Sequence, residues 1–147
     1  MDFLTAMEIA KSGLTAERAR LNITAMNIAN ANTTRTMEGG PYRAKSVVFR
    51  ATPLAEPVPA FGEVLDTARG RLRKVEVTEV LEDETAFKEV FDPGHPDADE
   101  NGIVRFPNVE VAEQMVDMIS AQRAYDANVT ALDSVKAMAL RALDISR

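Results

Sequence analysis

The sequence contains no cysteine in its 147 residues. This absence excludes disulfide bonds, catalysis by a thiolate and zinc sites built from cysteine. A zinc cage of several histidines is excluded too, because His95 is the only histidine. Aromatic residues make up 5% of the chain and tryptophan is missing, so any core depends mainly on alanine, valine, leucine and methionine.

Long apolar runs are also absent, and none approaches the ~20 residues that a membrane-spanning helix needs. The net charge of −6 argues against nucleic acid or an anionic membrane surface as the main partner. Residues 1–13 lack the basic region followed by an apolar stretch that marks a cleaved secretory signal. We therefore expect no nucleic-acid partner, no direct membrane insertion and no cleaved signal peptide. By ordinary rules such a chain stays in the cytosol unless it leaves by an unusual route.

Helix breakers are scarce at both ends of the chain. All seven prolines and six of the seven glycines lie between residues 39 and 107, which leaves the two flanks free to form helices. Apolar periodicity predicts one helix over residues 3–29 and another over 110–144. At 1.5 Å per residue the second helix would be about 50 Å long. Helices of that length with sustained heptads are typical of coiled coils and bundles.

Each flank carries an apolar row at helical spacing. In the N-terminal flank a large apolar residue recurs at every seventh position: Met7, Leu14, Leu21 and Ile28. The row of the C-terminal flank is interrupted by Gln122 and Lys136 and consists of Val111, Met115, Met118, Tyr125, Val129, Leu132, Ala139 and Leu143. Since each row alone would stay exposed, we expect the two helices to pack on each other.

Four segments between the flanks are predicted to be strands: residues 45–51, 71–82, 87–91 and 102–106. The first is a short apolar run, and the second alternates partly between apolar and charged residues. Residues 52–64 contain three prolines. This segment therefore cannot be a central strand and is predicted to be a loop.

The predicted fold class is α+β. Long N- and C-terminal helices, within residues 1–35 and 108–147, form one discontinuous helical domain that resembles a coiled coil. A small β-rich insert over residues 36–107 separates them in the sequence and contains the proline-rich loop at 52–64.

The phrase "DADENGIVRFPN" offers weak candidates for a metal site. Asp97, Asp99 and Asn101 match the first half of a calcium-binding loop. The twelfth position, however, is Asn108 instead of the glutamate that such loops need. An Asn-Gly pair between two apolar runs is also typical of a hairpin turn. The turn is the favoured interpretation, and a calcium- or ligand-binding module at residues 92–108 is the alternative.

His95 lies in the same acidic, proline-rich segment, and we interpret it as a turn residue. The sequence offers no Ser-His-Asp set, no pair of carboxylates placed for acid–base catalysis and no phosphate-binding loop. We therefore predict that the chain is not an enzyme, has no catalytic residues and binds no cofactor.

Three phrases resemble those of a known family and occur in the same order. They are "LNITAMNIANANTTRT" at residues 21–36, "FDPGHPDADENGIVRFPNV" at 91–109 and "EQMVDMISAQRAYDANVTALDSVKAMALRAL" at 113–143. The first and last are similar to the terminal signatures of the axial proteins of the bacterial flagellum, which form its rod, hook and hook-cap-associated parts. The middle phrase is most similar to that of the proximal rod proteins.

The resemblance implies a structural subunit of the flagellar basal body. Members of this family are exported unfolded by the flagellum's own type III apparatus, without a cleaved signal. They polymerise into the periplasmic rod, the drive shaft that links motor and hook. The resemblance thus implies that the partners are other rod proteins, copies of the chain itself and the export apparatus. It also reconciles the missing signal peptide with a location outside the cytoplasm.

The resemblance further implies an assembly interface on both terminal helices. The predicted interface consists of Met7, Leu14, Leu21, Ile28, Asn27, Asn30, Asn32, Met115, Met118, Tyr125, Val129, Leu132 and Leu143. Two roles stay open for its three asparagines. They fix the register against a neighbouring subunit, or they end the first helix and form a turn.

Overall fold

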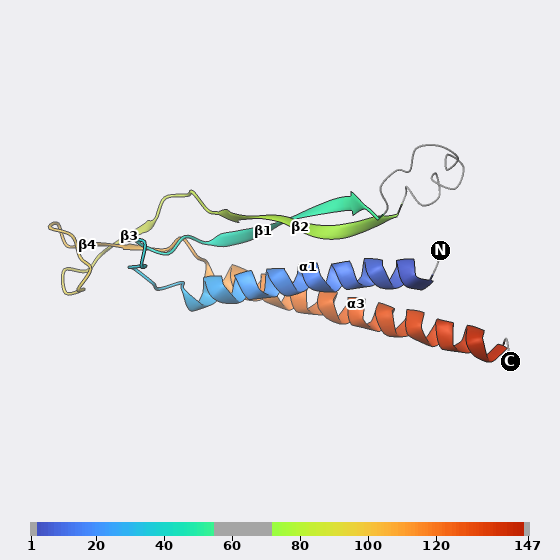
Figure 1. Cartoon of the computed structure of the whole chain (residues 1–147). Coiled ribbons are helices and arrows are strands. Elements are labelled where there is room, and N and C mark those ends of the chain that lie inside the picture. The colour runs from blue at the N-terminus through green and yellow to red at the C-terminus, as the bar shows by residue number, and fades with distance from the viewer. Residues whose placement is uncertain (1–2, 55–71, 146–147) are drawn as a thin grey trace, which may run out of the picture.

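The computed structural model describes residues 3–54 and 72–145 of the chain. Within these residues it contains two helices with four strands between them in the sequence (Figure 1), which confirms the predicted α+β class. The elements are α1 (Phe3–Ala29), β1 (Lys45–Pro53), β2 (Arg73–Glu82), β3 (Lys88–Phe91), β4 (Ile103–Phe106) and α3 (Val111–Ile145). The two predicted helices begin and end within one residue of the observed ones, and all four predicted strands are present.

α1 is the middle layer of the molecule. On one side it packs against α3, which runs antiparallel to it, and on another it packs against β1 and β2 (Figure 1). The predicted packing of the two terminal helices on each other is thus confirmed. The β3–β4 hairpin lies at the opposite end of the molecule from the start of α1 and the end of α3.

Three hydroxyl side chains inside α1 donate to the helix backbone. The hydroxyls of Ser12, Thr15 and Thr24 donate to backbone carbonyls three or four residues earlier, at 2.7, 3.0 and 2.9 Å. At the C-terminal end, the Met26 carbonyl accepts from the Asn30 side chain at 2.9 Å and from the Asn30 backbone N–H at 3.0 Å. An asparagine therefore closes the last turn of α1, where many helices use a glycine.

A bulge in β2 decides which side chains share a face. β1 and β2 pair antiparallel, and the pairing shifts by one residue at Thr78, which has no partner in β1. Simple alternation would place Val80 on the opposite face from Val75 and Val77, because the step from 77 to 80 is odd. The bulge brings all three onto one face. Val75 and Val77 there line a groove with Ser12 of α1.

β3 and β4 also pair antiparallel, but a loop longer than a two-residue turn connects them. The loop runs over residues 92–102, and the Asp99 carboxylate accepts at 2.9 Å from the backbone N–H of Asn101. Gly102 ends the loop with a φ of +74°, and a Cβ there would lie 3.0 Å from the Phe91 ring. The predicted turn at Asn101 and Gly102 is therefore present as the last part of a longer loop.

The predicted proline-rich loop at 52–64 lies mostly outside the described residues. Its first residues are described, and Thr52 and Pro53 end β1 instead of standing in a loop. This corrects the predicted start of the segment. Pro53 is tolerated because it is the last residue of a strand in a two-stranded sheet.

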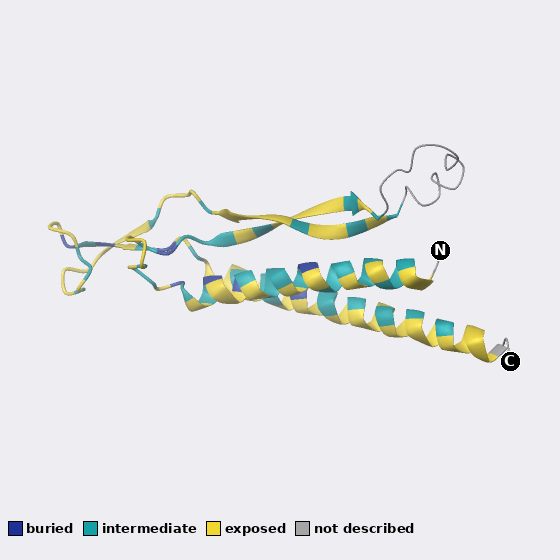
Figure 2. Cartoon of the chain, viewed as in Figure 1, coloured by how far each residue is buried: buried dark blue, intermediate teal, exposed yellow. Residues whose placement is uncertain are grey.

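The buried interior of the described residues is small (Figure 2). Two polar residues, Thr24 and Asn27, are buried, together with five residues of the core: Ala16, Ala31, Tyr42, Val104 and Ala121. Among the α3 residues whose burial is described, Ala121 alone is buried, although the helix is 35 residues long. The rest of a single chain therefore covers little of α3. No helix within the described residues combines the length and apolar character needed to cross a membrane.

Candidate assembly site

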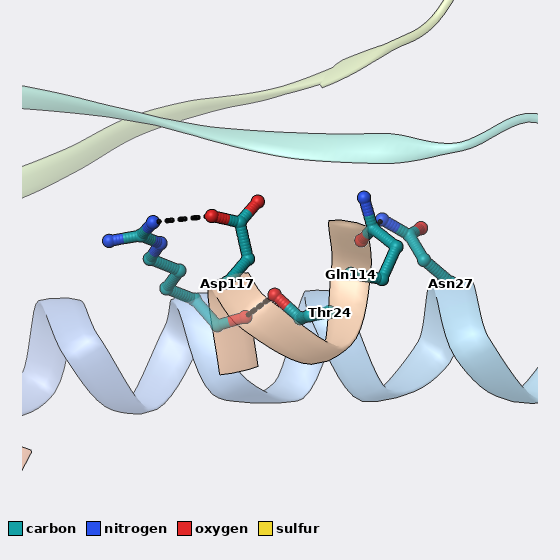
Figure 3. Close-up of polar contacts among 5 residues, drawn as sticks. Thr24, Asn27, Gln114 and Asp117 are labelled. Carbon is teal, nitrogen blue, oxygen red and sulfur yellow. Dashed lines mark hydrogen bonds and ion pairs between the residues drawn. The ribbon is translucent and has the colours of Figure 1, made fainter. Parts of the chain in front are cut away.

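A buried asparagine joins the two helices to the first strand. Asn27 is 2% exposed, and its Nδ2 donates to the Lys45 carbonyl at 2.8 Å and to Gln114 Oε1 at 2.9 Å. Its Oδ1 accepts from the Lys45 backbone N–H and from the Tyr42 hydroxyl, both at 2.9 Å. Figure 3 shows Asn27 and Gln114 reaching toward each other from the two helices. Because an asparagine side chain has two N–H donors and one oxygen with two lone pairs, its bonding capacity is used in full.

Two titratable groups beside Asn27 have shifted pKa values. Burial raises the pKa of the Tyr42 hydroxyl above its ordinary value of 10.0. A hydrogen bond to Glu82, 3.0 Å from Lys45 Nζ to Glu82 Oε1, raises the pKa of Lys45 above its ordinary value of 10.5. Both groups therefore keep their protons near neutral pH. Tyr42 remains a hydrogen-bond donor to Asn27, and Lys45 remains a cation.

Two further contacts join α1 to α3. Arg20 Nη2 and Asp117 Oδ1 lie 3.1 Å apart, with side chains 33% and 46% exposed, so this ion pair contributes at most about 1 kcal/mol. At Gly13, a Cβ would lie 3.0 Å from Asn128 Nδ2, so glycine allows a closer approach of the helices than any other residue. We call the following six residues the polar row: Gly13, Arg20 and Asn27 of α1, with Asn128, Asp117 and Gln114 of α3.

The predicted apolar interface residues lie beside the polar row. On α1 all four are half-buried: Met7, Leu14, Leu21 and Ile28. The last three each directly follow a member of the polar row in the sequence. On α3 three are half-buried: Met118, Tyr125 and Leu132. Three more on α3 are exposed by 54%, 37% and 67%: Met115, Val129 and Leu143. The helix pair therefore leaves part of each predicted apolar surface accessible.

The three asparagines of the predicted interface have different surroundings. Asn27 makes its bonds within the chain, so any contribution to assembly is indirect, through the elements that it holds together. Asn30 bonds back to α1, and its Oδ1 accepts from the Thr33 hydroxyl at 3.2 Å. These bonds correspond to the interpretation in which the asparagines end the helix and form a turn. Asn32 is exposed, and its part in an interface stays a prediction.

The candidate calcium ligands Asp97 and Asp99 accept hydrogen bonds from protein groups, Asp97 from outside its own loop. Asp97 Oδ2 accepts from the Thr34 hydroxyl at 2.8 Å, and Asp97 Oδ1 lies 3.9 Å from Arg35. Asp99 Oδ1 accepts hydrogen bonds from the backbone N–H groups of Asn101 and Ile103, both at 2.9 Å. In the part of the chain that the structure describes, no three histidine, aspartate or glutamate side chains gather as a metal site requires. The calcium-binding alternative thus has no observation in its favour.

His95 is a structural residue of the same loop, as predicted. Its Nδ1 accepts from the Asp97 backbone N–H at 3.1 Å. Its ring packs edge-on against Phe106, with 6.0 Å between the ring centroids. The imidazole therefore supports the loop through one hydrogen bond and one aromatic contact.

Sequence periodicity missed most of the residues at which the helices meet. Apart from Asn27, the polar row has no member in the predicted interface, because a search for apolar rows passes over polar and small residues. The available signal was their spacing. Gly13, Arg20 and Asn27 recur at every seventh position, as the apolar residues next to them do.

Comparison with known proteins identifies relatives over the whole chain. Residues 7–35 match the family model "Flagella basal body rod protein", and residues 100–145 match "Flagellar basal body rod FlgEFG protein C-terminal". The chain is 42% identical to flagellar basal-body rod protein FlgC of Escherichia coli O157:H7, over 100% of both chains. It is 41% identical to FlgC of Borreliella burgdorferi, over 99% of this chain and 98% of the relative. It is 35% identical to FlgC of Bacillus subtilis, over 97% of each.

Proposed function

The chain belongs to the FlgC family of flagellar basal-body rod proteins, and from this premise we propose that its two terminal helices join neighbouring subunits of the rod. The protein is a structural subunit of the bacterial flagellar basal body and not an enzyme. As a rod component it associates with other flagellar components. The proposal concerns which surfaces make those contacts.

The exposed apolar surface of α3 carries the proposal. Eight large apolar residues of this helix are exposed by 37–67%: Val111, Met115, Val116, Ile119, Val129, Met138, Leu140 and Leu143. α3 also has 35 residues against 27 in α1, which makes it about 12 Å longer at 1.5 Å per residue. Apolar surface of this extent along one helix is typical of a site that another protein covers.

The free energy gained by burying these apolar side chains favours contacts with several neighbours over contact with one. Burying a large apolar side chain contributes ~1.5–3 kcal/mol, and these side chains are roughly half exposed. A neighbour would therefore gain about 1 kcal/mol at each, or about 8 kcal/mol over the helix. Association costs ~4–15 kcal/mol in lost freedom. Contact with one neighbour is thus marginal, and simultaneous contacts in a polymer make the assembly stable.

We propose that copies of this chain and other rod proteins supply these contacts together. Their terminal helices would pack side by side, through head-to-tail contacts that do not close into a ring. The predicted apolar residues of α1 would add to the surface that α3 presents, because they are only half-buried within the single chain.

A charged substitution on the exposed face tests this proposal. Ile119→Asp should be made and exported, yet leave the basal body without a complete rod, because it places a carboxylate where an apolar contact forms. Ser120→Asp is the matched control, since it introduces the same side chain at the next position, which is also exposed. Swimming in soft agar and electron microscopy of isolated basal bodies provide the readouts. Normal swimming of both variants would refute the proposed role of the α3 face.

We further propose that the protein acts in the periplasmic rod and reaches it through the flagellar type III export apparatus, without a cleaved signal peptide. The family resemblance supports this, and a chain without cysteine cannot form wrong disulfides when it arrives unfolded in an oxidising compartment. In cells without a working export apparatus, the protein should stay in the cytoplasm at unchanged mass. Its release from those cells, or a shortened product in export-competent cells, would contradict this route.

A further inference from the structure

Three contacts between α1 and α3 involve polar side chains or glycine, and half-buried apolar residues adjoin them in the sequence of α1. Asn27 bonds to Gln114, Arg20 pairs with Asp117, and Gly13 leaves room for Asn128. We infer that this polar row fixes the antiparallel register of the two helices within the subunit, and that the flanking apolar residues do not.

Two contacts of the row repeat with the same spacing on both helices, and the third, Arg20 with Asp117, lies between them in sequence. Gly13 and Asn27 lie fourteen residues apart on α1, and their partners Asn128 and Gln114 lie fourteen apart on α3. Midway on α3 stands Ala121, which is 0% exposed. Since both spacings are two heptads, all contacts of the row are made together at one alignment of the helices.

A slip by one heptad would break this match. It would move Asn27 to the level of Ala121, whose methyl group cannot accept the hydrogen bond that Gln114 accepts now. It would also bring Arg20 to the level of Asn128, where glycine stands now and where a Cβ at position 13 would already lie 3.0 Å from Asn128 Nδ2. The polar row therefore distinguishes the observed register from its nearest competitor.

The apolar row on α1 cannot make this distinction. Met7, Leu14, Leu21 and Ile28 are similar in size and stand seven residues apart, so a slip by one heptad replaces each by another of its kind. Polar residues within a helix contact have their best-attested role in setting register, where apolar residues alone tolerate several alignments.

Spin-label distances within one chain test the inference, whatever the chain assembles with. The protein has no cysteine, so Arg18→Cys and Lys136→Cys give two labelling sites, both exposed and outside the polar row. The sites are offset along the helix axes. A slip by seven residues therefore changes their separation by up to about 10 Å.

The test variant replaces the two α3 side chains that bond to α1, as Gln114→Leu with Asp117→Leu. The matched control replaces the same residue types at exposed positions of the same helix, as Gln122→Leu with Asp126→Leu. The parent and the control should each give one distance maximum. The test variant should give a second maximum shifted by about 10 Å, with unchanged helical content by circular dichroism.

Three results would overturn the inference. One is a single, unchanged maximum in the test variant, because the register would then be set without the polar row. Another is loss of helical content in the test variant but not in the control, because the row would then supply stability instead of register. The third is a broad distribution in the parent protein, which would mean that the register is not fixed in the subunit.

Discussion

Replacing Asn27 by leucine should destabilise the subunit by about 2–4 kcal/mol. Leucine has the same number of side-chain heavy atoms and the same branching as asparagine, and it makes none of its four hydrogen bonds. The Tyr42 hydroxyl and the backbone N–H and carbonyl of Lys45 lose their partner. A buried group left unpaired costs ~1–3 kcal/mol, and because both Lys45 groups are only partly buried we use ~1–2 kcal/mol for each of the three. Three such groups give roughly 3–6 kcal/mol. The apolar burial of leucine offsets about 1–2 kcal/mol of this. Gln114 is half-buried and can turn toward water, so we assign it no cost.

Urea unfolding followed by far-UV circular dichroism measures this loss as a lower midpoint at unchanged slope. Asn22→Leu is the matched control, because Asn22 is exposed on the same helix and the change in helix propensity is identical. Its effect should stay within about 0.5 kcal/mol. Tyr42→Phe removes one bond and should cost ~0.5–1.5 kcal/mol, since Asn27 Oδ1 keeps the Lys45 N–H. Equal midpoints for Asn27→Leu and Asn22→Leu would refute the reasoning.

Three further predictions follow from the geometry. Deleting Thr78 removes the bulge and turns part of the apolar face of β2 away from α1, so the melting temperature should fall, whereas Thr78→Ser should leave it unchanged. Gly13→Ala alone should give no gain in urea unfolding because its Cβ meets Asn128, but added to Asn128→Ala it should gain about 1 kcal/mol from helix propensity. Because burial raises the pKa of Tyr42, its contribution to stability is complete below pH 10.0 and is lost as the pH rises through the folded-state pKa. Stability should therefore fall above pH 10, and the fall should be shallower in Tyr42→Phe.

The elements of the fold could be predicted because their signals are local. Prolines and glycines gather between residues 39 and 107, and both flanks carry apolar residues at helical spacing, with interruptions at Gln122 and Lys136 in the second. The bulge could not be predicted in the same way. Val77 and Val80 are three residues apart, so regular alternation would place them on opposite faces. From the sequence alone, the segment therefore looks like an imperfect strand. The irregularity at Thr78 is recognised only against the pairing with β1.

The contact residues were harder to predict for a different physical reason. Large apolar residues at heptad spacing indicate that a helix has a partner, but they do not tell which side chains meet. Asn27 and Gln114 lie 87 residues apart, so their pairing depends on the helix alignment that it helps to set. In the loop at 92–102, a calcium site and a turn both use short carboxylates next to glycine. Asn108 at the twelfth position was the residue that separated the two interpretations.

A subunit of a polymer must fold into one shape and still leave apolar surface for its neighbours. If large apolar residues filled the contact between α1 and α3, they would be buried inside the subunit and unavailable to its neighbours. Such a contact would also tolerate a slip of one heptad. A row of glycine, asparagine, glutamine and one partly buried ion pair brings the helices together at one alignment and contributes little apolar burial. The predicted apolar interface residues of both helices then stand at fixed positions beside the row, half-buried on α1 and half-buried or exposed on α3. On this argument the polar row determines where the apolar surface lies, and the neighbours that cover that surface provide most of the stability of the assembly.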